Sequence, residues 1–285
     1  MILITGASGR VARRTAELAS LLGLELRLMS RNPQRAPKLA GAEVVRGDFA
    51  NPATLDQAFA GIGTALVVSG HARPGERARL HRNAFEAAAR AGVGHVIYIS
   101  LQGSSPGSKY PYSRDHDLSE QCLAASGIPF TVLRNAFYID MFLERFDAHG
   151  IARGPANGGR GAFVSREDCA RVAAAVLAAP PGGTHDVTGP EALSVADVAG
   201  RLGVLAGREL RFENESVEAG ERRMTRTRQE PGRIELDLGW YEAIAAGELQ
   251  HVSDAVRRFT GREALSMEEY FTAFPHLLDP LRPAA

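Results

Sequence analysis

Short apolar runs alternate with segments of helical periodicity through the first half of the chain. In the first helical segment, Val11, Thr15, Leu18 and Leu22 recur three or four residues apart, so that one face can be buried. The apolar runs predict strands over residues 2–4, 24–29, 43–46, 65–69, 95–100 and 130–133, and the segments between them predict helices over residues 10–22, 53–60, 75–91 and 115–125. This alternation predicts an α/β fold, a doubly wound parallel sheet with helices on both faces.

The pattern changes after residue 134, where glycine-rich and charged segments appear. Residues 150–161 predict a loop or hairpin, residues 220–233 a mobile loop, and residues 167–179, 194–206, 240–249 and 266–274 helices. We therefore expect a sheet domain over residues 1–150, completed by part of 163–190, and a smaller mixed α/β C-terminal lobe over most of 151–285. Such a lobe would cover the carboxyl edge of the sheet, where ligands bind in open α/β sheets.

The composition, with 45% hydrophobic and 23% charged residues, is that of an ordinary soluble globular protein. The 33 basic and 33 acidic residues balance, so we expect no direct nucleic-acid or membrane partner. The first predicted strand begins at Ile2 and leaves no room for a leader peptide, and no apolar stretch is long enough to span a bilayer. Cys122 and Cys169 show no CxxC spacing and are expected to be buried helix thiols. A cytoplasmic location is the default expectation, and the charge balance is compatible with a homodimer.

The first dozen residues carry the strongest chemical signal. A glycine turn, Gly6-x-x-Gly9-x-x-Ala12, directly follows the first strand and opens the first helix. Backbone N–H groups and the positive end of a helix together attract phosphate, so this context predicts a dinucleotide site rather than a tight turn without a ligand. The expected contacts in this segment are Thr5, Gly6, Ser8, Gly9, Arg10 and Val11.

The end of the second strand indicates which dinucleotide is bound. An NAD site usually has Asp or Glu there to hold the ribose hydroxyls, whereas this chain has Ser30 and Arg31. A guanidinium can pair in a bidentate manner with a 2′-phosphate, so the sequence favours NADP(H) over NAD(H). The alternative for Arg31 is a solvated surface arginine. Asp48 and Phe49 follow the third strand and are expected near the adenine, with a turn role as the alternative for Asp48.

Several blocks of the sequence resemble the NmrA-like branch of the atypical short-chain dehydrogenases, in particular type-2 quinone oxidoreductases and triphenylmethane reductases. The resemblance implies an NADP(H)-binding Rossmann domain and a small lobe that forms the substrate cleft. Some members of the branch reduce quinones or related electrophiles, and others act as redox sensors that regulate a partner. The blocks that carry it are residues 5–10 (TGASGR), 30–33 (SRNP), 47–49 (GDF), 88–100, 116–120, 126–135 (SGIPFTVLRN), 163–168 (FVSRED) and 248–271.

The sequence departs from the Tyr-x-x-x-Lys pair with which short-chain dehydrogenases protonate an alkoxide. Tyr112 is followed four residues later by His116, which falls where related reductases carry the lysine. We expect His116 to hold the nicotinamide ribose or to donate a proton near neutral pH, with Glu120 one helical turn away to orient it. The alternative is a helix-surface histidine paired with Glu120. Tyr112 and Lys109 are the other catalytic candidates, next to a Gly/Ser-rich loop that is expected to close over the substrate.

Aromatic side chains past the sixth strand are expected to form the wall on which a planar substrate stacks. Quinone reduction needs little more than this stacking and the exclusion of water, because the product anion is delocalised. The remaining predicted nucleotide contacts are Ser69, Gly70, His71, Ser100, Asn135, Phe137 and Tyr138; the predicted substrate contacts are Tyr138, Phe142, Phe163 and Trp240, with core packing as the alternative for each aromatic.

We therefore expect an NADPH-dependent reductase of quinones or similar small planar electrophiles. The alternatives are a nucleotide-sensing regulator without turnover and an epimerase of the extended branch, which the missing Tyr-x-x-x-Lys pair disfavours. No metal is expected, because His71, His81, His95 and His116 lack the spacing of known ligand motifs.

Overall fold

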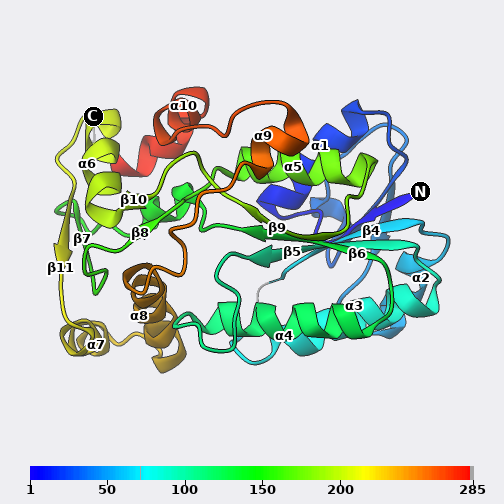
Figure 1. The fold of residues 1–285 in the computed structure, drawn as a ribbon, viewed down its shortest axis with the longest axis horizontal. Helices are drawn as coiled ribbons and strands as arrows, with labels where there is room; N and C mark the ends of the chain where they lie inside the picture. Colours follow the sequence, from blue (N-terminus) through cyan, green and yellow to red (C-terminus); the bar gives the residue numbers. More distant parts are fainter. Residues whose placement is uncertain (71, 283–285) are drawn as a thin grey trace.

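The computed structural model describes residues 1–70 and 72–282. Over these residues the chain forms a seven-stranded parallel sheet with helices on both faces and a lobe beyond one end of the sheet (Figure 1). The strand order β3-β2-β1-β4-β5-β6-β9 reverses between β1 and β4, the position at which doubly wound sheets bind ligands. The strands are β1 Ile2–Ile4, β2 Leu26–Ser30, β3 Glu43–Arg46, β4 Thr64–Val68, β5 His95–Leu101, β6 Phe130–Asn135 and β9 Gly183–Val187.

Two layers of helices bury the sheet and confirm the predicted α/β fold (Figure 1). The small side chains Ala12, Ala16 and Ala19 let the first helix approach the sheet and its neighbouring helix closely. In the described part of the chain, no helix combines the length and the apolar character that crossing a membrane requires. One face carries α1 (Arg10–Leu21), α5 (Arg166–Ala178) and α9 (Ala255–Thr260), and the other carries α2 (Ala53–Phe59), α3 (Arg77–Arg90) and α4 (Pro111–Ala125).

The C-terminal lobe has a hydrophobic core of its own, centred on the fully buried Phe142 and Trp240. Two short strand pairs frame it, β7 with β11 in parallel and β8 with β10 antiparallel. Residues 150–161 are therefore not a hairpin, because both of their strands pair with later segments. The lobe comprises β7 Ile151–Gly154, β8 Arg160–Gly161, β10 Leu193–Ser194, β11 Arg211–Asn214, α6 Val195–Ala206, α7 Val217–Arg226, α8 Pro231–Ala245 and α10 Met267–Ala273. The 3-10 turns Ile139–Glu144 and Pro275–Leu281 contribute to its core, and a third 3-10 turn, Pro33–Arg35, follows β2.

The prediction of a loop over residues 220–233 is wrong, because α7 and the start of α8 lie there. A Cβ on Gly220 would lie 2.8 Å from Leu238 Cδ2, so this glycine allows close packing of α7 on α8 and does not end a helix. Pro231 occupies the first turn of α8, where its missing N–H leaves no bond unmade. The helix predicted over residues 240–249 thus begins earlier, and it ends at Ala245.

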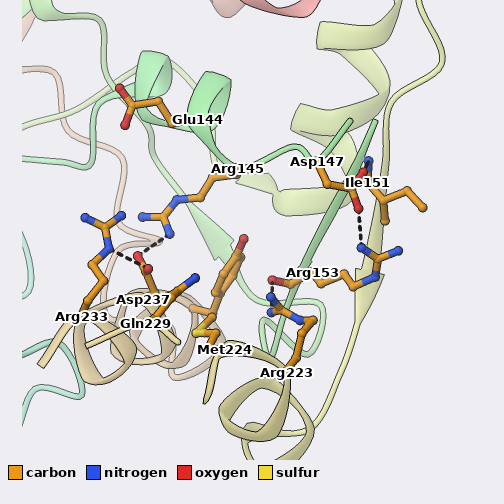
Figure 2. Close-up of a pocket in the computed structure, with 11 residues that line it drawn as sticks. Glu144, Arg145, Asp147, Ile151, Arg153, Arg223, Met224, Gln229, Arg233 and Asp237 are labelled. Carbon is orange, nitrogen blue, oxygen red and sulfur yellow. Dashed lines mark hydrogen bonds and ion pairs between the residues drawn. The ribbon is translucent and has the colours of Figure 1, made fainter. Parts of the chain in front are cut away.

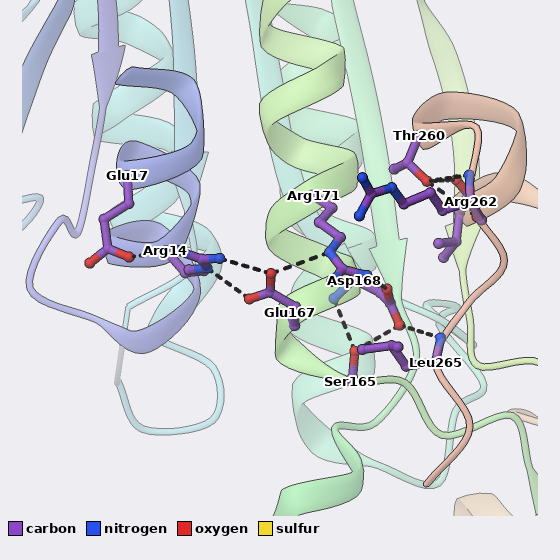
Figure 3. Close-up of polar contacts among 10 residues, drawn as sticks. Arg14, Glu17, Ser165, Glu167, Asp168, Arg171, Thr260, Arg262 and Leu265 are labelled. Carbon is purple, nitrogen blue, oxygen red and sulfur yellow. Dashed lines mark hydrogen bonds and ion pairs between the residues drawn. The ribbon is translucent and has the colours of Figure 1, made fainter. Parts of the chain in front are cut away.

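A polar junction fixes the start of α5 against α1 and against the C-terminal segment (Figure 3). Arg14 donates from Nε and Nη2 to the buried carboxylate of Glu167 at 2.8 and 3.0 Å, and Arg171 donates to the same carboxylate at 3.2 Å. Asp168 accepts a hydrogen bond from the backbone N–H of Leu265 at 2.8 Å. These contacts hold α1, and with it the glycine turn that precedes it, in a fixed position on the sheet.

Candidate active site

The glycine turn forms an uncapped, exposed helix N-terminus at the carboxyl end of β1. Gly6 has a φ of +62°, a conformation that favours glycine, and the N-cap residue Gly9 offers no side chain to cap α1. The first N–H groups of a helix have no partner within the helix. They therefore remain available to a phosphate, as the motif predicts.

Arginine side chains surround the end of β2. Ser30 Oγ accepts a hydrogen bond from the N–H of Asn32 at 3.2 Å and lies 3.4 Å from Ser8 Oγ, which joins the glycine turn to this strand end. Arg31 is exposed, and Arg13 donates to the backbone carbonyl of Arg35 at 2.6 Å. None of these three arginines forms an ion pair within 4.0 Å in residues 1–70 and 72–282. The strand end is thus positive and lacks the carboxylate that an NAD site uses.

The residues after β3 form a turn. Asp48 Oδ1 accepts from the N–H of Ala50 at 3.0 Å, which is the turn role considered for this residue. The half-buried ring of Phe49 lies edge-on to His81, with 6.2 Å between ring centroids. A contact of either residue with adenine stays a prediction.

Three buried polar atoms at the carboxyl edge lack partners in the described structure: Ser69 Oγ, Gln102 Oε1 and Asn135 Oδ1. Ser69 Oγ follows β4 and Asn135 Oδ1 ends β6, and neither has a hydrogen bond within the described structure. Buried polar groups are normally hydrogen-bonded, so these atoms point to a polar ligand at the edge. A nicotinamide carboxamide and its ribose fit them. Thr5 is already used, since its hydroxyl accepts from Val68 N at 2.9 Å, and His71 lies outside the described residues.

Arg10 takes part in a polar bridge that the sequence did not indicate. Its guanidinium donates to Asp140 at 3.1 Å, yet its side chain remains 67% exposed and accessible to a ligand. Asp140 is almost fully buried and also accepts from Arg166 at 2.7 Å. Arg166 in turn lies 4.0 Å above the ring of Tyr138, whose hydroxyl accepts from Asn135 at 3.2 Å. This bridge holds the start of α1 to the segment after β6.

His116 is buried and is not paired with Glu120, so the interpretation as a surface histidine is wrong. Arg77 donates to His116 Nε2 at 3.1 Å, and Tyr98 Oη lies 2.7 Å from Nδ1. An arginine only donates, so Nε2 carries no hydrogen and the ring N–H on Nδ1 points to Tyr98. Burial, and then the charges of Arg77 and His81, lower the pKa of His116 well below its ordinary value. The expectation that His116 donates a proton near neutral pH is therefore not supported.

Glu120 faces the sheet instead. Its carboxylate accepts from Arg134 at 2.6 Å and from the hydroxyl of Ser100 at 2.5 Å. Arg134, on β6, offers a fixed charge that the neutral His116 cannot match, and this explains the choice of partner. Ser100 is consequently bound to a side chain of the protein, and its contact with the nucleotide stays a prediction.

Tyr112 and Lys109 lie where the lobe meets α4. The Tyr112 hydroxyl donates to the carbonyl of Ala72 at 2.9 Å, and its ring faces the guanidinium of Arg77. The Lys109 side chain is exposed, and its N–H donates to Glu248 at 2.9 Å. Glu248 also accepts from Ser108 at 2.5 Å, so the Gly/Ser-rich loop, which the sequence predicts to be flexible, is tied to the lobe.

The predicted aromatic wall is largely part of the lobe core. Phe142 and Trp240 have no exposed surface, and Phe137 stacks on Trp240 with 5.3 Å between ring centroids. The rings of these three residues therefore contact other side chains, which is the packing alternative. Phe163 is also buried and lies edge-on to Phe142, with 4.7 Å between ring centroids. Tyr138 is half-buried and keeps some accessible surface beside Asn135.

Comparison with known proteins identifies the family. A family model described as NAD(P)H-binding matches residues 6–180, more than half of the chain. The chain belongs to this NAD(P)H-binding family. The matched segment runs from the glycine turn through α5 and contains the uncapped helix, Ser69 and Asn135.

Several relatives of this NAD(P)H-binding protein are oxidoreductases by name. Quinone oxidoreductase 2 of Escherichia coli is 32% identical over 223 residues, covering 75% of this chain and 77% of the relative. The crystal structure of the NADPH-dependent quinone oxidoreductase of Escherichia coli in complex with NADPH superposes with a TM-score of 0.87, at 26% identity, and covers 98% of this chain and all of that one. The Citrobacter sp. triphenylmethane reductase complexed with NADP(H) gives a TM-score of 0.85 at 27% identity over 96% of this chain and 99% of that one. These comparisons confirm the NmrA-like resemblance and the oxidoreductase class.

A cavity of about 240 Å³ lies elsewhere, in the lobe of the NAD(P)H-binding protein (Figure 2). Its guanidinium groups are matched by carboxylates: Arg145 and Arg233 donate to Asp237 at 2.7 and 2.8 Å, and Arg153 donates to Asp147 at 2.6 Å. This charge balance indicates no particular ligand. In the described chain, no three His, Cys, Asp or Glu side chains are grouped so that they could hold a metal ion.

Proposed function

We propose that the protein is an NADPH-dependent reductase of quinones or similar small planar electrophiles. The observation that carries the nucleotide preference is the end of β2, where the exposed Arg31 stands in place of a carboxylate and Arg13 contacts the backbone of the nearby Arg35. An arginine–phosphate pair with bidentate geometry stabilises a 2′-phosphate, which NADH lacks. NADPH in complex with the quinone oxidoreductase of Escherichia coli supports the same choice.

The residues present fit the nucleotide along the whole carboxyl edge. The turn from Gly6 to Val11 would hold the pyrophosphate, Ser30 and Arg31 the adenosine phosphate, and Ser69 and Asn135 the nicotinamide end. Bound there, a reduced nicotinamide supplies a hydride. The protein's part is to place a planar acceptor against it and to keep water away.

The acceptor side of the site supports a quinone-like substrate. Tyr138 presents aromatic surface next to Asn135, and the loop before Tyr110 is held to the lobe by Glu248. His116 is buried with its N–H turned toward Tyr98, so it is poorly placed to give a proton to an acceptor. A quinone tolerates this arrangement because its reduced anion is delocalised and one weak acid completes the reaction. Quinone oxidoreductase 2 of Escherichia coli, by its name, acts on such acceptors.

The decisive experiment follows NADPH absorbance at 340 nm with benzoquinones and naphthoquinones, and repeats each reaction with NADH. We expect consumption that depends on the acceptor and a clear preference for NADPH. Consumption with NADH at equal efficiency would refute the role given to Arg31. No consumption with any acceptor, together with tight binding of NADPH by fluorescence titration, would refute the reductase and favour a nucleotide sensor.

A further inference from the structure

Arg77, the first residue of α3, is a buried cation without a carboxylate partner. Arg77 is only 9% exposed, and within residues 1–70 and 72–282 its guanidinium forms no ion pair at 4.0 Å or less. Its Nε atom is also buried without a hydrogen-bond partner in the described structure. Burying a charge costs free energy unless a partner compensates it. The guanidinium contacts the ring of Tyr112 and the neutral His116, so it can stabilise negative charge that develops beside it.

The contacts of Arg77 connect the two positions at which short-chain dehydrogenases carry tyrosine and lysine. The guanidinium carbon lies 3.8 Å from the centroid of the Tyr112 ring, and Nη1 donates to His116 Nε2 at 3.1 Å. A positive charge therefore stands beside Tyr112 although His116 is not a lysine. It comes from a different helix, 39 positions earlier in the chain than His116.

We propose that Arg77 is a positioning residue that replaces the missing lysine of the Tyr-x-x-x-Lys pair. It supplies the fixed positive charge beside Tyr112 and holds His116 as the neutral tautomer with its hydrogen on Nδ1. The inference rests on the proposed function, because it assigns the acceptor's proton to Tyr112 in that same site.

Complete reduction of a quinone to a hydroquinone takes one hydride and one proton. The acceptor receives a hydride, two electrons and one hydrogen nucleus, from the reduced nicotinamide nucleotide, and one acceptor oxygen is left as an anion. The O–H bond of Tyr112 breaks, a new O–H bond forms on the acceptor oxygen, and the negative charge moves to Tyr112 Oη. The guanidinium of Arg77, fixed against the ring, stabilises that charge, and solvent water returns the proton to Tyr112 afterwards.

The test compares Arg77→Met with Arg77→Lys, with the double variant Arg77→Met/His116→Lys, and with Arg79→Met as a matched control from an exposed position of the same helix. Steady-state kinetics with NADPH and 1,4-benzoquinone give kcat and the KM for each substrate. We expect Arg77→Met to lower kcat about 10- to 100-fold, as expected when a proton donor loses its support, while the KM for NADPH changes much less. Arg77→Lys and the double variant should recover most of the loss, and Arg79→Met should match the wild type.

A second readout needs neither nucleotide nor turnover. In protein labelled with ¹⁵N-histidine, the His116 signals should show hydrogen on Nδ1 in the wild type and a redistribution toward Nε2 in Arg77→Met. If the wild type reduces no acceptor, the proposed function fails, while this spectrum still decides the Arg77–His116 contact. An unchanged tautomer in Arg77→Met, or an unchanged kcat in a wild type that turns over, would overturn the inference. Loss of kcat without rescue by either lysine variant would also overturn it and leave Arg77 a purely structural residue.

Discussion

Two buried histidines make the stability of this fold depend on pH. His81 is 1% exposed, and burial, then the charge of Arg77, lower its pKa to about 3. The same causes lower the pKa of His116 well below its ordinary value. In the unfolded chain both rings titrate near a pKa of about 6.5. Below that value the unfolded state therefore binds protons that the folded state does not.

The lowered pKa values determine the direction and the size of the change in the free energy of unfolding with pH. Because the pKa is lowered on folding, the stability that these rings contribute is fully present above pH 6.5 and is lost as the pH falls, down to about 3 for His81. At pH 5 the unfolded His81 is roughly 1.5 pH units below its pKa and the folded ring is still neutral. At about 1.4 kcal/mol per unit, folding loses about 2 kcal/mol between pH 8 and pH 5 through His81 alone. His116 adds a loss of the same sign.

The substitution His81→Asn isolates the pH-dependent contribution of His81 to the free energy of unfolding. Asparagine does not titrate and keeps a polar atom near Nδ1, which lies 3.0 Å from Tyr98 Oη. Urea unfolding followed by circular dichroism at pH 8 and pH 5 gives the free energy of unfolding for the wild type, His81→Asn and the exposed control His149→Asn. The variant should lose about 2 kcal/mol less than the wild type over this range, and the control should behave as the wild type. An equal loss in wild type and His81→Asn would show that His81 is not held neutral by the fold.

Three further substitutions test other parts of the structure. Arg31→Glu should weaken NADPH by at least about tenfold while NADH changes little, because a carboxylate repels the 2′-phosphate; fluorescence titrations with both nucleotides measure this. Asp140→Asn removes the carboxylate that Arg10 and Arg166 share and should destabilise the protein by about 3 kcal/mol in urea unfolding, since Arg166 is left buried without its partner. Trp240→Phe should cost about 1–3 kcal/mol, because it leaves a cavity between Phe137 and Arg145; thermal unfolding by circular dichroism checks it.

Local patterns predict six of the seven strands of the sheet, and β9 is anticipated only as an unspecified part of residues 163–190. The strands over residues 2–4 and 43–46 match the structure to the residue, and the serine caps at Ser165, Ser194 and Ser266 each accept from a backbone N–H at the predicted helix start. The region 217–245 is not predicted this way, because residues 220–233 are charged and weakly patterned, which favours a loop. Gly220 has no side chain because Leu238 packs against its Cα, and these two residues are too far apart in the sequence for a local pattern to show the contact.

The glycine turn and the surroundings of His116 differ in how far apart in the sequence their residues lie. The turn is built from consecutive residues, so Gly6 and Gly9 could be recognised directly. The environment of His116 comes from Arg77 and Tyr98, which reach it from another helix and from the sheet. Glu120 stands four residues from His116 and was paired with it on helical spacing, yet β6 brings Arg134 to the carboxylate. Helical spacing places two residues on one face but does not say which other element faces them.

Substitutions of Arg31 and Arg77 can distinguish a reductase from a nucleotide sensor, because the two arginines lie in different parts of the site. Arg31 follows β2, beside the expected adenosine phosphate, and Arg77 follows β4, beside Tyr112. A sensor needs only the first of these, since binding a nucleotide involves no proton transfer to an acceptor. A reductase needs both, and a substitution at each should act on a different quantity: affinity at Arg31 and kcat at Arg77. The burial of Arg77 without a carboxylate partner in the described chain costs free energy that a binding protein has no reason to spend, and this favours the reductase.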